Sequence, residues 1–512
     1  MSTKGFCHAK KHPLLDWSET MEPGVKLSSL ETETYYPAFK AHDARFDGRV
    51  FAGVSSTGIY CRPVCRARTP QEQNCTFFPS AAAAEAVGYR PCLKCRPELA
   101  PGLTPTDAST NLARRAALLL EEDCLRKDSL KKLAQSLGVT SGHLSRLFVT
   151  EFGVSPAQYL QTCRLLLAKN LLTDTRLPAA DVAFTAGFGS VRRLNALFQK
   201  HYHLSPPALR KQRKLSNKGA PDVITLYPGY RPPYLWDNLL AFLAARTVPG
   251  VEYVAGQAYH RTVAIPHDGK TYRGWLTVQH AEKKKALAVT IPVTLLPVLP
   301  QVLARVKDLF DLRCEPWEIY HRLAVMNEIK DGMCLPGARP PGCFDAFELA
   351  VRAVLGQQIT VKAAHTLAGR IVSVYGTALD TPVDGLTHTF PSPADICGLD
   401  GPIENHLGAL GVTGARARSI RALAEGLLSG EIDLSGRPDP QMQMEKLLAL
   451  PGFGTWTVHY VAMRALGWPD AFPHTDYGVK KALAGRTAKE ILALSEHWKP
   501  WRAYATINLW MC

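Results

Sequence analysis

Residues 450–480, LPGFGTWTVHYVAMRALGWPDAFPHTDYGVK, constrain the fold of this chain more than any other stretch. An apolar helical pattern, MEKLLAL, stops at Pro451, and a second helical pattern starts at Thr455. Between them, Gly452 and Gly454 allow positive φ and carry no Cβ, so backbone N–H groups at the start of the next helix can approach a phosphate. The stretch therefore predicts two helices joined by a hairpin that holds a phosphate.

The hairpin is followed by aromatic residues and by an acidic residue at the expected start of a further helix. The second helical pattern carries Trp456 and Tyr460, and the chain then returns to Asp476. We take Asp476 as the candidate catalytic carboxylate. A structural alternative stays open at this point, in which Pro451 and the glycines only end a helix, the aromatic residues belong to the core, and Asp476 is an N-cap.

Residues 223–312 follow a different pattern, in which apolar and polar residues alternate as they do in strands. The strand-like segments begin at Tyr259, Tyr272 and Ala286. Helical patterns flank them at 236–245 and 301–312, so an antiparallel sheet with two helices is expected. From about Pro316 to the end of the chain the pattern is helical.

Three sequence blocks, in the same order, resemble the helix-hairpin-helix family of DNA base-excision glycosylases, and most closely the AlkA-type 3-methyladenine DNA glycosylases. They are the hairpin stretch 450–480, FDAFELAVRAVLGQQIT at 344–360 and WKPWRAYATINLW at 498–510. The resemblance covers 223–512 and implies an antiparallel β subdomain at 223–315 and an all-α helix-hairpin-helix domain at 316–512. It also implies hydrolysis of the N-glycosidic bond of an alkylated purine.

This resemblance implies a pocket for a base that has rotated out of the duplex. The family's substrate-binding positions fall on Trp456, Tyr460, Trp510, Gln357 and Gln358. N3-methyladenine is cationic and already a good leaving group, and electron-rich ring faces attract such a ring by roughly 1 to 2 kcal/mol each. Asp476 would stabilise the oxocarbenium-like sugar or orient the attacking water, and Gly452 and Gly454 would contact DNA.

Some residues depart from the wider family and sharpen the expectation. Glycosylases that also cut the backbone place a lysine on the second hairpin helix as a Schiff-base nucleophile, and residues 450–479 contain none. The sequence therefore predicts a monofunctional enzyme that leaves an abasic site. After Asp476 the only cysteine is Cys512, so the iron–sulfur cluster of some relatives is not expected. The family's apolar DNA wedge falls on Gln358, so the wedge is either polar or supplied by Ile359.

Four cysteines within residues 31–103 have the spacing of a zinc site. They are Cys61 and Cys65 in CRPVC and Cys92 and Cys95 in CLKC. Closed tetrahedral sites of four thiolates use two such pairs, and a small domain gains from the metal the stability that its core does not supply. The sequence predicts one Zn²⁺ here, and a purely structural role is the simplest interpretation.

The residues around the four cysteines, FDGRVFAGVSSTGIYCRPVCRART and FFPSAAAAEAVGYRPCLKCRPE, resemble the amino-terminal domain of the Ada family. In that family the first cysteine, here Cys61, also accepts a methyl group from a methylphosphotriester in DNA, and Thr57 and Arg68 match phosphate contacts. Zinc keeps the sulfur as a nucleophilic thiolate, and methylation makes the site one charge less negative. Since a thioether is not readily reversed, the transfer would act once and switch DNA binding.

Residues 107–213 carry a helical pattern with an internal repeat. HLSRLFVTEFGVSP at 143–156 recurs as RRLNALFQKHYHLSP at 192–206, and each copy follows a short helix and a turn. Two helix-turn-helix units result, and they resemble the AraC-type DNA-binding domain. Each second helix would enter a major groove, with Arg146 and Arg193 among the contact residues. A helical bundle without a role in DNA binding is the alternative.

The whole chain has a formal charge of +15 and thirteen cysteines. The charge favours a polyanionic partner such as double-stranded DNA, and the odd, scattered cysteines argue against a secreted disulfide scaffold. The amino-terminal residues contain no apolar run long enough for a signal peptide or a membrane span, so a cytoplasmic protein without a membrane partner is expected. Residues 1–30 are expected to be a disordered extension, and 214–222 a basic linker.

Together these patterns predict a multidomain α+β protein. Its parts are a small four-cysteine zinc domain, an all-α double helix-turn-helix domain, and a glycosylase with an antiparallel β subdomain and an all-α helix-hairpin-helix core. The expected function is alkylation repair and adaptive-response regulation by a monomer that binds DNA and RNA polymerase. The alternative is a transcription regulator whose last domain is catalytically inactive and only grips DNA. The Pro-Cys-His-Arg motif of the Ada O6-methylguanine transferase is absent from the sequence.

Overall fold

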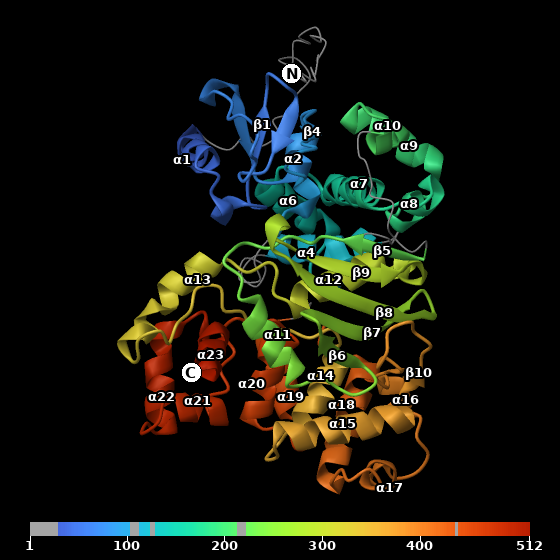
Figure 1. Ribbon diagram of the computed structural model, residues 1–512, viewed down its shortest axis with the longest axis vertical. Helices are drawn as coiled ribbons and strands as arrows, with labels where there is room; N and C mark the ends of the chain where they lie inside the picture. Colours follow the sequence, from blue (N-terminus) through green and yellow to red (C-terminus); the bar gives the residue numbers. More distant parts are fainter. Residues whose placement is uncertain (1–28, 103–111, 123–128, 212–221, 436–438) are drawn as a thin grey trace.

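The computed structural model describes residues 29–102, 112–122, 129–211, 222–435 and 439–512 (Figure 1). The predicted extension at 1–30 lies outside these residues except for its last two, which begin helix α1 (Ser29–Lys40). The predicted linker at 214–222 lies outside them except for its last residue. In Figure 1 a five-stranded sheet separates the large helical region at the bottom from the two amino-terminal regions at the top.

The first region is a small sheet flanked by helices. Its strands are β1 (Phe51–Val54), β2 (Ile59–Cys61), β3 (Cys75–Phe78) and β4 (Arg90–Pro91). Helix α2 (Ala81–Ala86) lies between β3 and β4 in the chain. The strand order is β3-β1-β2-β4, and β2 pairs with β4 in parallel. Because parallel strands end at the same edge of a sheet, Cys61 at the end of β2 and Cys92 just after β4 come together.

The second region is helical and contains the predicted repeat. Its helices are α4 (Leu112–Glu122), α5 (Ser129–Ser136), α6 (Ser141–Phe152), α7 (Pro156–Asp174), α8 (Ala179–Thr185), α9 (Val191–Tyr202) and α10 (Pro206–Lys211). The pairs α5–α6 and α8–α9 are the two helix-turn-helix units, and α7 joins them. Equivalent residues of the repeat occupy equivalent core positions: Leu144 and Leu194, like Phe148 and Phe198, are fully buried. The predicted all-α double helix-turn-helix fold is confirmed.

The third region begins with the five-stranded sheet. Its elements are β5 (Val223–Leu226), α11 (Trp236–Ala244), β6 (Glu252–Ala255), β7 (Ala258–His267), β8 (Lys270–Ala281), β9 (Ala286–Pro292) and α12 (Leu299–Leu309). The strand order is β5-β9-β8-β7-β6, and every neighbouring pair is antiparallel. This confirms the predicted antiparallel sheet with two helices. Its apolar core is continuous with that of the second helix-turn-helix unit.

The rest of the chain is the large helical region. It contains α13 (Pro316–Leu323), α14 (Ala346–Leu355), α15 (Val361–Tyr375), α16 (Pro393–Cys397), α17 (Ile403–Gly408), α18 (Gly414–Ser429), α19 (Pro440–Leu448), α20 (Thr455–Arg464), α21 (Tyr477–Ala482), α22 (Ala488–Ser495) and α23 (Arg502–Met511). A short ladder of β10 (Thr377–Ala378) and β11 (His388–Thr389) interrupts this helical pattern. The Thr262 hydroxyl of β7 donates to the His388 carbonyl at 2.9 Å and ties the ladder to the sheet.

Buried polar contacts join the cysteine region to the sheet region through Arg231, which is 1% exposed. Its guanidinium donates to the carbonyls of Asp47 at 2.7 Å and Gly102 at 2.5 Å, and its Nε lies 3.2 Å from Glu315 Oε2. The Asp47 carboxylate in turn accepts from Arg62 Nε at 2.8 Å. A chain of charged groups therefore runs from the cysteine region into the sheet region. None of the described helices has the length and apolar character needed to span a bilayer.

Candidate active site and metal centre

The hairpin between α19 and α20 has the predicted boundaries, with Thr455 as the first residue of α20. Gly452 has φ +76°, and a Cβ at this position would collide with the Ser419 hydroxyl. Gly454 differs, because it is the extended N-cap of α20 with φ −89°, and a Cβ there would meet no neighbour within 4 Å. Both glycines allow positive φ, and the turn uses it only at Gly452. The lack of a side chain at Gly454 leaves the first N–H groups of α20 without a side-chain cap.

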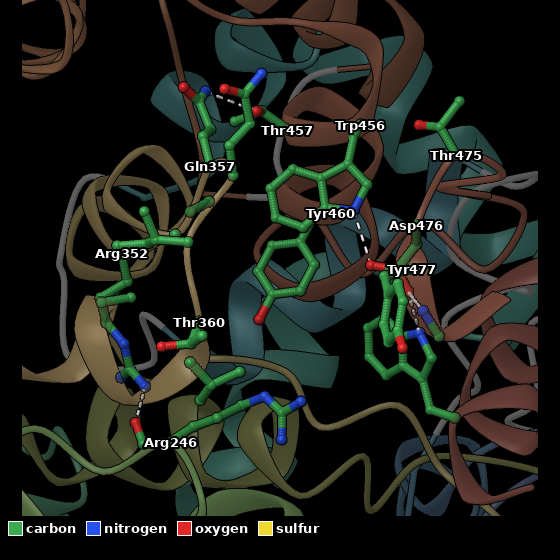
Figure 2. Close-up of a pocket in the computed structure, with 18 of the residues that line it drawn as sticks. Arg246, Arg352, Gln357, Thr360, Trp456, Thr457, Tyr460, Thr475, Asp476 and Tyr477 are labelled. Atoms are coloured by element: carbon green, nitrogen blue, oxygen red, sulfur yellow. Dashed lines mark hydrogen bonds between the residues drawn. The ribbon is translucent and has the colours of Figure 1, made fainter. Parts of the chain in front are cut away.

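Asp476 is held by hydrogen bonds to both carboxylate oxygens. Its Oδ1 accepts from the backbone N–H groups of Gly478 at 2.8 Å and Val479 at 3.3 Å and from Trp510 Nε1 at 2.8 Å. Its Oδ2 accepts from Trp456 Nε1 at 2.9 Å, a bond drawn in Figure 2. Asp476 is thus the N-cap of α21, as the structural alternative proposed, and it also lies on the wall of a cleft.

The cleft in front of Asp476 has a volume of about 1460 Å³ and is lined by aromatic rings. Trp456 stacks on Tyr460 with ring centroids 5.2 Å apart and planes at 19°. Trp510 stacks on Phe242 at 5.7 Å and 9°, and lies 6.3 Å from Tyr460. The structure therefore brings together the predicted aromatic residues and the predicted acid in one cavity.

Arg246, just after α11, lines this cleft, and Phe242 of α11 packs on the cleft residue Trp510; the sequence analysis found neither of them. Phe242 stacks on Trp510, and the Arg246 guanidinium carbon lies 3.7 Å from the Phe242 ring centroid. The signal available in the sequence was their position on the helix. The buried stripe of α11 is formed by Trp236, Leu239, Leu240 and Leu243. Phe242 and Arg246 are four residues apart and lie off that stripe, so they form a second face.

Gln357 and Gln358 also line the cleft, in different ways. Gln357 Nε2 donates to the Gly452 carbonyl at 2.8 Å and to Thr457 Oγ1 at 2.9 Å, so this side chain braces the hairpin (Figure 2). Gln358 lies between α14 and α15, is exposed, and has φ +55°. A non-glycine residue held in the left-handed region stores strain, and such residues concentrate at functional sites. Ile359 beside it is half-buried.

Tyr460 is surrounded by positive charge. Burial by itself raises the pKa of Tyr460, but Arg464, Arg246 and Arg352 together outweigh it and lower that pKa below its ordinary value. Arg464 Nη1 donates to the Tyr460 hydroxyl at 2.6 Å. These three arginines were not predicted from the sequence, because they come from separate elements and only the fold assembles them.

The loop that carries Asp476 is anchored at two points, Asp470 and Phe472. Burial lowers the pKa of His459 to about 4, with His474 and Arg502 acting in the same direction. The neutral ring then accepts at Nδ1 from the backbone N–H of Phe472 at 3.2 Å. Nearer the start of the loop, the Arg502 guanidinium forms two hydrogen bonds of 2.7 Å with the Asp470 carboxylate. Asp476 is therefore presented on a rigid connection between α20 and α21.

The four predicted cysteines form a separate centre. The sulfur atoms of Cys61, Cys65, Cys92 and Cys95 all lie within 4.8 Å of one another. Zinc with four sulfurs at about 2.3 Å places them about 3.8 Å apart, so this cluster fits a tetrahedral metal site. The backbone N–H of Arg62 points at Cys95 Sγ at 3.3 Å, as expected for a thiolate acceptor.

The residues predicted to contact DNA are on the surface of the amino-terminal regions. Thr57 is exposed in the turn between β1 and β2, and Arg68 is exposed in the loop after Cys65. Arg146 of α6 and Arg193 of α9 are exposed on the second helix of each helix-turn-helix unit. They lie opposite the buried leucine and phenylalanine positions of the repeat, so both second helices present a free polar face.

Family models match all three regions. The metal binding domain of Ada matches residues 34–98, a helix-turn-helix domain matches 133–212, and the AlkA N-terminal domain matches 224–345. The HhH-GPD superfamily of base excision DNA repair proteins matches residues 351–490. The fold and the site thus define a DNA repair glycosylase joined to a DNA-binding transcription activator with an Ada metal-binding domain.

Curated relatives agree with this class. The chain is 37% identical over 487 residues to the Mycobacterium tuberculosis protein "Probable bifunctional transcriptional activator/DNA repair enzyme AlkA", covering 93% of this chain and 96% of that protein. It is 36% identical over 281 residues to DNA-3-methyladenine glycosylase 2 of Escherichia coli, covering 55% of this chain and 95% of that protein. It is 28% identical over 190 residues to the bifunctional transcriptional activator/DNA repair enzyme AdaA of Bacillus subtilis, covering 37% and 87%. The chain belongs to the family of bifunctional transcriptional activators and AlkA-type DNA repair enzymes.

Proposed function

We propose that this protein hydrolyses the N-glycosidic bond of alkylated purines of the 3-methyladenine type in double-stranded DNA. The observation that carries the proposal is the placement of Asp476. Its carboxylate is fixed by the indole N–H groups of Trp456 and Trp510 and faces a cleft lined by aromatic rings. This arrangement suits a flipped-out base beside an anion that faces the sugar.

In the proposed reaction Asp476 stabilises the positive charge that develops on the deoxyribose. The bond between C1′ and the base nitrogen breaks, and its electron pair leaves with the base. Water forms the new bond to C1′ and loses a proton, so that one water is consumed and an abasic site remains. Because four N–H donors hold the carboxylate, it needs no rearrangement as charge develops.

The reaction is proposed to stop at base removal. A backbone-cutting mechanism needs an amine on the second hairpin helix, and α20 (Thr455–Arg464) contains no lysine. Lys480 and Lys481 line the cleft, but they lie in the last turn of α21, beyond Asp476.

The hairpin between α19 and α20 and the loop that carries Gln358 between α14 and α15 are proposed to bind the DNA. The uncapped N–H groups that follow Gly452 and Gly454 would bind a phosphate. Gln357 would keep the hairpin in place against α14 and border the substrate, and Gln358, with Ile359, would enter the gap left by the flipped base. All three residues line the cleft, and this position and the φ of Gln358 support the assignment.

For the amino-terminal part, we propose that Cys61, Cys65, Cys92 and Cys95 hold one Zn²⁺. The metal would keep the sulfurs as thiolates at neutral pH. Cys61 would attack the methyl carbon of a methylphosphotriester, with Thr57 and Arg68 on the phosphate. The S–C bond forms as the C–O bond breaks, the phosphodiester anion leaves, and the site becomes one charge less negative. The methylated site would repel the DNA phosphates less, so DNA binding would become stronger. Because the transfer is irreversible, each protein molecule would make this change only once.

The switch is proposed to act on promoter binding through the two helix-turn-helix units. Arg146 and Arg193 would meet adjacent major grooves, and RNA polymerase would be the partner at the promoter. The proposed units are the zinc domain at 31–103, the DNA-binding domain at 107–213, and the two parts of the glycosylase at 223–315 and 316–512. A cytoplasmic monomer fits these roles.

The test compares wild type with Asp476→Asn on methylated duplex DNA and measures released 3-methyladenine under single-turnover conditions. We expect release by wild type and a loss of at least about a hundredfold in the variant, since one fixed charge at a developing cation is removed. No release by wild type would support the alternative of a regulator with an inactive glycosylase domain. Equal release by both proteins would move the chemistry away from Asp476.

Asp439→Asn is the matched control. Asp439 caps α19 with the same geometry as Asp476, since it accepts from Gln441 N at 2.8 Å and Met442 N at 3.3 Å. It does not line the cleft. A loss of release that comes only from a weakened helix cap would appear in both variants, whereas a catalytic role affects Asp476→Asn alone.

A further inference from the structure

Two of the three guanidinium groups around Tyr460 form several contacts with protein groups. Arg352 is paired with Glu252 at 2.7 Å and with Glu348 at 3.0 Å. Arg464 donates to the Tyr460 hydroxyl at 2.6 Å and to two main-chain carbonyls at 2.8 and 3.0 Å. The charge of Arg352 is therefore compensated by carboxylates, and each nitrogen of the Arg464 guanidinium, which does not line the cleft, donates within the protein.

The third group, Arg246, is not compensated in this way. Within the part of the chain that the structure describes, no carboxylate lies within ion-pair distance of its guanidinium. Its side chain packs over the Phe242 ring, and its Nη1 donates to the Phe242 carbonyl at 3.2 Å. A guanidinium has five N–H donors, so donors remain for a ligand in the cleft. Burial lowers the pKa of Arg246, while Tyr460 and Asp476 oppose that shift, and the group keeps its charge.

Arg246 and Asp476 face different ends of the same cleft. In Figure 2 the Arg246 side chain extends into the cavity toward the hydroxyl end of Tyr460, whereas Asp476 lies beside the Trp456 indole. A base whose glycosidic carbon faces Asp476, and whose ring lies along Tyr460, therefore turns its far edge toward Arg246.

The far edge of a purine differs between the two base types. A 6-oxopurine such as guanine or hypoxanthine presents a carbonyl oxygen at C6, whereas an adenine presents an amino group that donates. A guanidinium can only donate, so it forms hydrogen bonds with the carbonyl and none with the amino group. The charge matters as well. A neutral base leaves with the electron pair of the broken bond and becomes an anion, which a guanidinium stabilises, whereas a base that is already cationic is repelled by it.

We infer that Arg246 is the specificity-determining residue that reads the leaving base, and that it favours bases with a carbonyl at C6 over alkylated adenines. The inference rests on the proposed glycosylase function and deepens it. Arg246 donates to the carbonyl oxygen in the Michaelis complex and strengthens that contact as negative charge moves onto the base. Its contribution is therefore largest for a neutral 6-oxopurine, intermediate for 7-methylguanine, and absent or unfavourable for 3-methyladenine.

The experiment measures single-turnover release of three bases by wild type and by Arg246→Met. Methylated duplex DNA supplies 3-methyladenine and 7-methylguanine in one reaction, and a duplex with a single hypoxanthine supplies the neutral base. We expect Arg246→Met to lower hypoxanthine release at least about tenfold, the effect of losing one charge-assisted hydrogen bond. Release of 7-methylguanine falls relative to 3-methyladenine, and 3-methyladenine release stays within about threefold of wild type or rises.

The possible failures are distinguishable. If wild type releases no base at all, the proposed function fails and this inference falls with it. If wild type releases 3-methyladenine but the ratios among the three bases are the same in Arg246→Met, only this inference is overturned. A parallel loss of all three bases also overturns it, because it would show a structural role.

Arg246→Lys serves as the second variant. It keeps the charge but lacks the planar fork of donors, so the inference predicts hypoxanthine release between that of wild type and Arg246→Met. Methionine retains an apolar stem on the Phe242 ring, and the 3-methyladenine rate reports in the same tube whether the cleft is intact. Lysine and methionine variants with equal hypoxanthine rates would contradict the role of the charge.

Discussion

Replacing Arg231 by methionine should uncouple the cysteine region from the rest of the molecule. Methionine fills much of the space of the buried stem but removes the donors to the carbonyls of Asp47 and Gly102 and the charge beside Glu315. Glu315 is 2% exposed, and Arg231 is its ion-pair partner at 3.2 Å. Removing one member of a buried pair leaves an uncompensated charge, so we expect a loss of about 3 to 5 kcal/mol in the free energy of unfolding.

The free energy of unfolding should also depend on pH through Glu315. Burial raises the pKa of Glu315 to about 7, and Arg231 and Arg49 oppose that rise. Because the folded pKa lies above the ordinary value of 4.5, the folded state binds the proton more tightly than the unfolded chain. This group's stabilisation is complete below about pH 4.5 and is lost as the pH rises toward 7, by about 3 kcal/mol in total. Without Arg231 the loss extends to higher pH.

The assay is calorimetric unfolding of wild type and Arg231→Met at pH 5.5 and pH 8. We expect the wild-type cysteine and sheet regions to unfold together, and the variant to show an earlier separate transition that moves further at pH 8. Arg418→Met is the control, because Arg418 pairs with Glu404 at the surface, where water screens the pair and its loss leaves no buried charge. An Arg231→Met curve that matches the control at both pH values would refute the reasoning.

Three further predictions concern the hairpin, the metal and the reaction type. Gly452→Ala should weaken DNA binding in fluorescence anisotropy by about tenfold, because φ +76° and the Ser419 hydroxyl exclude a Cβ, whereas Gly454→Ala should bind within about twofold of wild type. Zinc removal with a chelator, or Cys92→Ser, should lower the unfolding temperature of the amino-terminal region and leave base release unchanged, and an unaltered unfolding curve would contradict a structural metal. Borohydride should trap no covalent complex with damaged DNA, and a trapped adduct would show a lysine nucleophile.

The features that sequence reasoning located are those encoded within one short stretch. The start of α20 at Thr455, the helix start at Asp476 and the glycine turn all follow from local patterns, and the structure has them in those places. The repeat of the helix-turn-helix units was visible because Leu144 and Leu194 occupy the same buried position. Local periodicity and helix capping were therefore sufficient to predict the fold class.

The features that sequence reasoning missed depend on packing between distant elements. Arg246 reaches the cleft, and Phe242 supports Trp510, because α11 packs beside α23, and no pattern near Asp476 indicates either residue. Both glycines of the hairpin allow positive φ, but which of them adopts it depends on the packing of the turn, and only Gly452 does. Arg231 looks like a surface arginine in the sequence, yet the junction of three segments buries it.

The central claim, that the Asp476 carboxylate faces the positive sugar in the cleft, can be tested by binding. Two duplexes would be compared, one carrying a cationic pyrrolidine in place of a deoxyribose and one carrying a neutral tetrahydrofuran. The account predicts that wild type binds the cationic duplex at least about tenfold more tightly than the neutral one and that Asp476→Asn loses this preference while Asp439→Asn keeps it. An equal preference in wild type and Asp476→Asn would contradict the account.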